Sequence, residues 1–161
     1  MLRALGLKCC LPVLAALLSA CHAAPARAQA PAEGGLYIAG AEFGFQVAAQ
    51  RALAQNPPGR RFFVLALPPE TNALTTRASA SQAALRERVR QAGGVLFVCQ
   101  RDIDSGRVPA ARLAPGVVAV RGWPPSGVGV LSDGQRHVSG EDPAALPASN
   151  EALRRLRSSC S

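Results

Sequence analysis

The sequence predicts an α/β domain with a mostly parallel sheet of four to five strands and helices on both faces. Short apolar runs alternate along the chain with amphipathic helical patterns, which is typical of βαβ units. One run, Arg61–Leu67, is apolar throughout after its first residue, as expected for a strand between two helical layers. Right-handed crossovers between parallel strands then pack the helices against the sheet.

The first half of the predicted fold consists of two strands joined by a helix. Gly35–Gly40 is a short apolar run bounded by glycines, which favours a strand. Apolar residues in Phe45–Leu53 recur three and four positions apart and predict an amphipathic helix. Asn56–Gly59 contains two prolines and a glycine, which end that helix. Arg61–Leu67 is the second strand.

The next unit is a capped helix followed by a third strand. Ser79 or Thr76 is a suitable cap for a helix that continues to about Ala92. The glycine pair Gly93-Gly94 closes it in the usual C-terminal manner. Val95–Cys99 is then the third strand.

The rest of the chain contains two further apolar runs and one amphipathic helix. A short helical turn is expected at Arg101–Ser105, a fourth strand at Gly116–Val120 and a fifth at Gly127–Leu131. Residues 132–147 have no clear periodicity, so we expect them to be extended along the surface or poorly ordered. Asn150–Ser158 is the last predicted helix.

Residues 1–30 have the features of a secretory signal. Arg3 and Lys8 precede the apolar stretch Cys9–Ala20, and A-x-A cleavage candidates follow it at Ala26–Ala30. A second processing route stays open, because Leu18–Cys21 resembles a bacterial lipobox in which Cys21 is lipidated and tethers the domain to a membrane. Either route predicts a periplasmic or secreted protein. The chain then divides into a leader (1–30), an α/β domain (31–131) and a loop with a C-terminal helix (132–161).

Composition restricts the classes of protein to which the chain can belong. With 161 residues, 48% of them hydrophobic and 17% charged, it suits one globular domain. The two histidines, His22 and His137, are too few for a multi-histidine metal site. Neither a G-x-G-x-x-G motif nor a P-loop occurs, so no cofactor is expected. The formal charge of +8 falls to about +5 without the leader, and dispersed arginines do not favour nucleic acid binding.

Candidate functional residues follow the strands, because ligands bind outside the carboxyl ends of strands in open α/β sheets. Cys99 ends the third strand, and three interpretations stay open: a reactive thiol, a buried core residue, or a disulfide with Cys160. A helix N-terminus and Arg101 would lower the pKa of a Cys99 thiol, whereas Asp102 would raise it.

Other candidates carry weaker signals. Glu42 follows the first strand and is either a ligand contact or a solvated helix-start acid. Trp123 either packs on the domain or contacts a partner. The arginines of the last helix could touch anionic lipid headgroups: Arg154, Arg155 and Arg157.

The stretch Gly94–Gly122 resembles the DsrE/DsrF-like group of small α/β proteins. It has a strand ending in Cys99, a short helix, the turn Leu113–Gly116 and a valine-rich strand. The resemblance covers roughly residues 35–128 and implies a three-layer flavodoxin-like domain that assembles into trimers or hexamers. It also implies, for some members, sulfur relay through a persulfide on the cysteine at the Cys99 position.

Two functions therefore remain as hypotheses. In the first, an exported domain carries sulfur: a Cys99 thiolate accepts a sulfane sulfur and passes it to the thiol of a partner protein, with Arg101 stabilising the thiolate. In the second, the domain is a non-catalytic binding or assembly module in which Cys99 is a core or disulfide residue.

Overall fold

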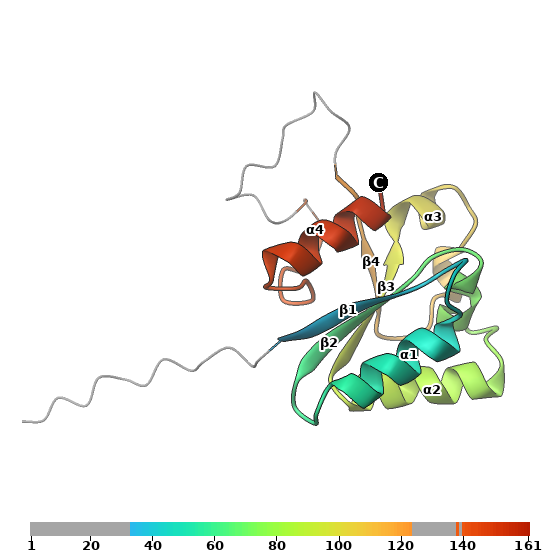
Figure 1. Cartoon of the computed structure of the whole chain (residues 1–161). Helices are drawn as coiled ribbons and strands as arrows, with labels where there is room; N and C mark the ends of the chain where they lie inside the picture. Colours follow the sequence, from blue (N-terminus) through green and yellow to red (C-terminus); the bar gives the residue numbers. More distant parts are fainter. Residues whose placement is uncertain (1–32, 124–137, 139) are drawn as a thin grey trace, which may run out of the picture.

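The computed structural model of the protein describes residues 33–123, 138 and 140–161 (Figure 1). Several features expected from the sequence lie outside these residues: the leader 1–30 with Cys21, the fifth strand at Gly127–Leu131, and His137. Within the described part of the chain, no helix is long and apolar enough to cross a membrane.

Strands and helices alternate along the chain as the apolar pattern predicts. In order, the elements are β1 (Glu33–Ala39), α1 (Phe45–Gln55), β2 (Arg61–Ala66), the 3₁₀ helix η1 (Glu70–Leu74), α2 (Ala80–Gln91), β3 (Gly94–Cys99), α3 (Gln100–Asp104), the 3₁₀ helix η2 (Ala110–Arg112), β4 (Val117–Val120) and α4 (Asn150–Ser159). Of the two candidate N-caps of α2, Ser79 and Thr76, the structure shows Ser79. Its hydroxyl accepts a hydrogen bond from the N–H of Gln82 in a capping box.

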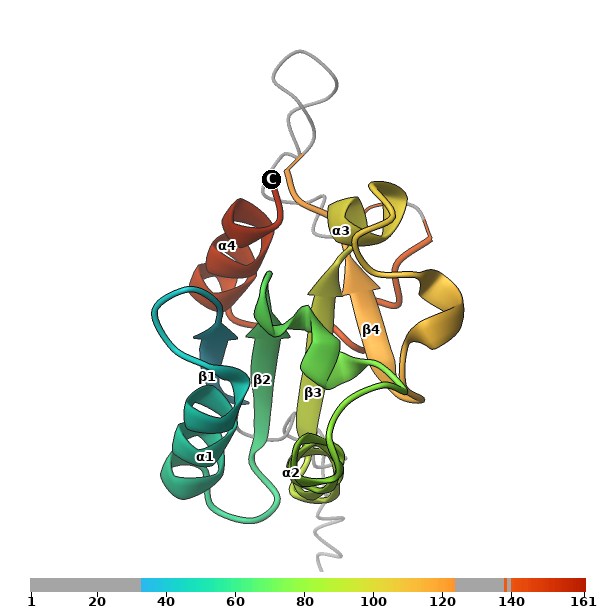
Figure 2. The same cartoon turned by 90° about the vertical axis from the view of Figure 1, so that its right-hand side faces the viewer.

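The four strands are all parallel, and their order in the sheet, β1-β2-β3-β4, is their order in the chain. Successive right-handed crossovers in one direction place their helices on the same face. Accordingly, α1 and α2 cover one face of the sheet and α4 covers the other (Figure 2). The predicted α/β fold with three layers is therefore confirmed, and β1 and β4 lie at the two edges of the sheet formed by the described strands.

Two hydrophobic clusters hold these layers together. On one face, Ala49 and Ala52 of α1 and Val89 of α2 pack against alternate residues of the sheet, including Val64 and Val98. On the other face, the intervening strand residues contact α4; these contacts involve Phe63, Phe97, Leu153 and Leu156. Strand β2 supplies buried side chains to both clusters, which is why its sequence is apolar at consecutive positions.

The segment before α4 differs from its sequence-based expectation. Residues 132–147 were expected to be extended along the surface or poorly ordered, but in the described part Ala145 and Leu146 are buried. Leu146 joins the core under α4. The end of this segment, at Leu146, therefore packs on the same face of the sheet as the C-terminal helix that follows it.

Candidate functional site

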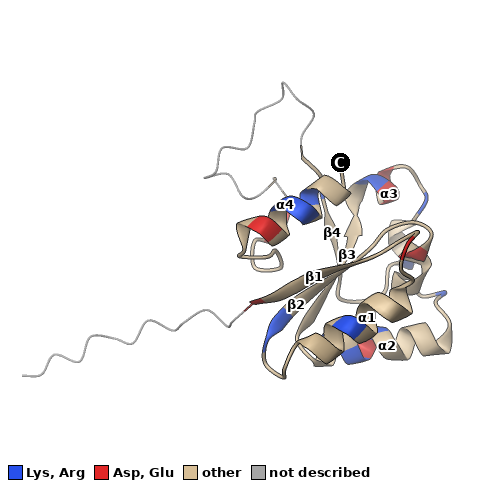
Figure 3. Cartoon of the chain, viewed as in Figure 1, with Lys and Arg blue, Asp and Glu red and all other residues tan. Residues whose placement is uncertain are grey.

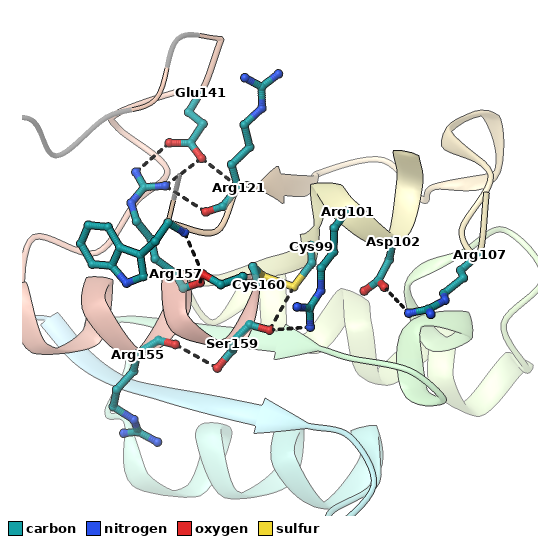
Figure 4. Close-up of a disulfide and its surroundings, with 12 residues drawn as sticks. Cys99, Arg101, Asp102, Arg107, Arg121, Glu141, Arg155, Arg157, Ser159 and Cys160 are labelled. Atoms are coloured by element: carbon teal, nitrogen blue, oxygen red, sulfur yellow. Dashed lines mark hydrogen bonds and ion pairs between the residues drawn. A yellow bond between two sulfur atoms is a disulfide. The ribbon is translucent and has the colours of Figure 1, made fainter. Parts of the chain in front are cut away.

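The parallel sheet brings the carboxyl ends of its strands to one edge of the molecule, as expected from the sequence. Cys99 lies at the carboxyl end of β3 and is fully buried. It forms a disulfide with Cys160, 61 residues later, with 5.1 Å between the two Cα atoms (Figure 4). Of the three interpretations of Cys99, the structure contains the disulfide, which joins the end of α4 to the end of β3.

Close backbone packing places Cys160 beside the sheet. A Cβ atom on Gly122 would lie only 2.4 Å from the carbonyl oxygen of Cys160, so the C-terminal segment needs a glycine at this position. The backbone N–H of Trp123 donates to the hydroxyl of Ser161 at 2.9 Å, and its indole N–H donates to Ser158 Oγ at 3.2 Å. Trp123 therefore contacts α4 and the C-terminus, as its packing interpretation predicts, although its side chain stays partly exposed.

Arg101 lies beside the disulfide but binds a backbone carbonyl. Its guanidinium donates to the Ser159 oxygen at 3.0 Å, and this oxygen is 3.8 Å from Cys99 Sγ (Figure 4). A disulfide sulfur has no proton to lose and forms no thiolate. The thiolate that Arg101 was expected to stabilise is therefore absent in this state. Instead, Arg101 helps to attach the end of α4 to α3.

Asp102 is turned away from the disulfide. Its carboxylate is fully buried, and Oδ1 lies 3.4 Å from the guanidinium of Arg107 (Figure 4). Among the described residues, its second oxygen has no hydrogen-bond partner. The carboxylate expected to act on the Cys99 thiol instead faces the loop after α3.

Sequence reasoning missed a buried ion pair on the other side of the disulfide. Glu141 and Arg157 form this pair, with 2.8 Å between Arg157 Nη2 and Glu141 Oε2. Both side chains are almost completely inaccessible to solvent. Arg157 Nη1 donates to Glu141 Oε1 and to the carbonyl of Arg121. The expectation that Arg157 touches lipid headgroups is wrong, because its guanidinium lies inside the protein. Its position on the same stripe of α4 as Leu153 was the available signal.

The environment of Glu141 favours its ionised form. Burial alone would raise the pKa of this carboxyl. Hydrogen bonds from Arg157 and from the backbone N–H groups of Arg121 and Val138, together with the charge of Arg157, outweigh burial and hold the pKa below its ordinary value. The Glu141 carboxyl is therefore ionised at neutral pH, and its pair with Arg157 fixes the described residues before α4 against the end of β4.

A groove runs along the outer edge of β1, between the helical layers. Its volume is about 440 Å³, and we call it the β1 groove. The strand itself contributes Leu36, Tyr37 and Ile38, so residues that face both layers line it. Its apolar lining continues into the loop after β1 and onto α1. Figure 3 shows basic residues on both α1 and α4, which lie on opposite sides of this edge.

The charged residues of the β1 groove come from three elements. Arg51 of α1 and Arg155 of α4 supply one guanidinium from each layer, and Glu42 supplies an exposed carboxylate from the loop. Arg51 lies over the ring of Phe43, 4.7 Å from its centroid, and this ring is itself exposed. Glu42 thus lies where a ligand could touch it.

The acid at the start of α1 is Glu70 and not Glu42. Its carboxylate accepts a hydrogen bond from the backbone N–H of Phe45 at 2.7 Å, a contact that was not predicted from the sequence.

No protein-family model matches the sequence, and no curated protein matches it significantly. Within the described residues, there is no group of three or more His, Cys, Asp or Glu side chains that could hold a metal ion. What the described chain offers is a three-layer α/β domain with a buried disulfide at the sheet edge and an amphipathic groove along an edge strand.

Proposed function

We propose that this protein is an exported binding domain of the DsrE-like type, in which the Cys99–Cys160 disulfide is structural and the β1 groove receives the ligand. The observation that carries the proposal is the disulfide itself, because it occupies the sulfur on which a persulfide would have to form. Both cysteines are buried, so a donor or partner thiol has little access to either sulfur. Export to an oxidising compartment, as the leader-like residues 1–30 suggest, would preserve the bond.

The β1 groove supports the binding part of the proposal. It combines apolar side chains with a few charged ones, which is the usual composition of a ligand site. Its lining includes the loop that follows the carboxyl end of β1, and α/β proteins bind ligands beyond the carboxyl ends of their strands. Phe43, which lines the groove, stays exposed, although it is a large apolar side chain that burial against a ligand would stabilise.

The sulfur-carrier hypothesis makes a different prediction in one experiment. The purified oxidised protein is incubated with a sulfane sulfur donor, such as polysulfide, and its intact mass is measured beside those of Cys99→Ser and Cys160→Ser. We expect wild type to gain no sulfur. A sulfur atom gained by wild type but not by Cys99→Ser would overturn the proposal and establish the carrier. Cys160→Ser is the matched control, since it leaves Cys99 as a free thiol.

A further inference from the structure

The outer edge of β1 carries main-chain groups that no other described strand uses. The N–H of Leu67 donates to the carbonyl of Ala39 at 2.8 Å, so Ala39 bonds toward β2. In a parallel ladder, alternate residues direct both their N–H and C=O groups to the same neighbour. Tyr37 therefore also bonds toward β2, whereas Leu36 and Ile38 direct these groups outward. Among the described elements, β2 is the only strand that pairs with β1.

The two residues that carry these outward groups, Leu36 and Ile38, both line the β1 groove. Free N–H and C=O groups on an edge strand are a template for another extended chain. The side chains of such a chain would alternate between the two layers, as those of β1 do. Tyr37 and Ala48 lie on the α1 side, and Leu36 and Leu67 lie on the α4 side, so each side offers an apolar surface.

Charge indicates what kind of chain fits. One guanidinium borders the groove on each side, Arg51 on the α1 side and Arg155 on the α4 side. Among the described residues, neither forms an ion pair with a carboxylate. Glu42 offsets one of the two charges, which leaves the groove basic. A second copy of this domain paired through β1 would bring its own Arg51 and Arg155 to the same edge, so an acidic ligand is favoured over a second copy.

We propose that the β1 groove binds an extended peptide segment that carries apolar and acidic side chains and that pairs with β1 as an additional strand. This mode of recognition takes its affinity from main-chain hydrogen bonds to Leu36 and Ile38 and its specificity from the flanking side chains. The inference rests on the proposed function, since it names the ligand class and the binding mode of the same groove.

The test uses the full oxidised chain and a synthetic peptide. The probe is a fluorescein-labelled peptide in which pairs of valines alternate with pairs of glutamates, so that each layer meets both apolar and acidic side chains. It is blocked at both ends and long enough to cover the seven residues of β1. Binding is measured by fluorescence anisotropy. Two matched peptides serve as controls: one has lysine in place of glutamate, and the other is N-methylated at every residue, which removes the main-chain donors of both peptide edges without any change to the protein.

We expect the glutamate peptide to bind and each control peptide to bind at least about tenfold more weakly. The N-methylated peptide loses two main-chain hydrogen bonds, which together amount to roughly that factor. The lysine peptide places like charges beside Arg51 and Arg155. The variant Arg51→Glu/Arg155→Glu should bind the glutamate peptide more weakly by a similar factor, while Arg88→Glu, a control at an exposed residue of α2 outside the groove, should not. Amide hydrogen exchange should slow at Leu36 and Ile38 when the peptide is added.

Three outcomes would overturn the inference. The first is no binding of any peptide, and the second is equal binding of the N-methylated peptide. The third is a concentration-dependent dimer that protects the Leu36 and Ile38 amides without peptide, which would assign the edge to a second copy. None of these results affects the sulfur-loading experiment, so failure of this inference is distinguishable from failure of the proposed function.

Discussion

Breaking the Cys99–Cys160 bond should cost the domain a large part of its stability. The bond closes a loop of 61 residues, and the chain-entropy relation for a loop of that length gives about 4 kcal/mol. That value is a large fraction of the stability of a typical domain, about 5–15 kcal/mol. With a urea dependence of about 2 kcal/mol per molar, the unfolding midpoint should fall by about 2 M.

The assay is urea unfolding of oxidised wild type, reduced wild type and the Cys99→Ser/Cys160→Ser variant. Unfolding is followed by circular dichroism and by the fluorescence of Trp123, the single tryptophan, which contacts α4 near the disulfide. We expect the reduced protein and the variant to share one lowered midpoint. Equal midpoints before and after reduction would refute the reasoning, because they would mean that the bond is absent or closes no constrained loop.

Three further predictions concern the residues around the disulfide. Glu141→Gln should destabilise the domain by about 3–5 kcal/mol in urea unfolding, because it removes the carboxylate that the buried Arg157 binds; a change below about 1 kcal/mol would contradict the ion pair. The pKa of Glu141 is lowered in the fold, so the stability from this group is present above the ordinary glutamate pKa of about 4.3 and is lost as the pH falls through the lower folded value. Thermal melts between about pH 7 and about pH 3 should therefore show a larger loss for wild type than for Glu141→Gln, and parallel losses would contradict this linkage. Gly122→Ala should cost about 1–3 kcal/mol because its Cβ meets the Cys160 backbone, whereas the control Gly35→Ala, whose Cβ is 3.5 Å from the Tyr37 ring, should change stability by less than about 0.5 kcal/mol; equal effects would contradict the close packing.

The layers of the fold could be predicted because the apolar pattern is different in each kind of element. The sequence of β2 is apolar at consecutive positions, and its strand is buried on both faces. The sequence of α1 is apolar on one stripe, and Ala48, Ala49 and Ala52 of that stripe are buried. The capping residue Ser79 sets the start of α2 through local hydrogen bonds, so it could also be found without tertiary information.

The candidate site was harder to predict because it depends on long-range packing. Cys99 and Cys160 are separated by 61 residues, and only the packing of α4 on the sheet brings their Cα atoms to 5.1 Å. Before that packing is known, a thiol, a core residue and a disulfide are all compatible with the sequence. The partner of Arg157 is Glu141, which lies in a segment with no periodicity, so the burial of this arginine could be suspected but its counter-charge could not.

The β1 groove depends on the order of strands in the sheet. An apolar pattern shows that Gly35–Gly40 contains a strand, but it does not show that this strand lies at an edge. Its mixed burial, with Gly35 exposed and Leu36 buried, reflects the edge position and contrasts with the continuous burial of β2. Once the order is known, the outward direction of the Leu36 and Ile38 main-chain groups follows from the pairing with β2.

A peptide map of the native protein without reduction, made after free thiols are blocked with an alkylating reagent, detects the Cys99–Cys160 bond itself. We expect the peptide containing Cys99 to be joined to the C-terminal peptide containing Cys160 and neither cysteine to carry the reagent. An alkylated Cys99, or a Cys99 that carries an additional sulfur atom, would contradict the structural disulfide and return the function of the protein to sulfur transfer.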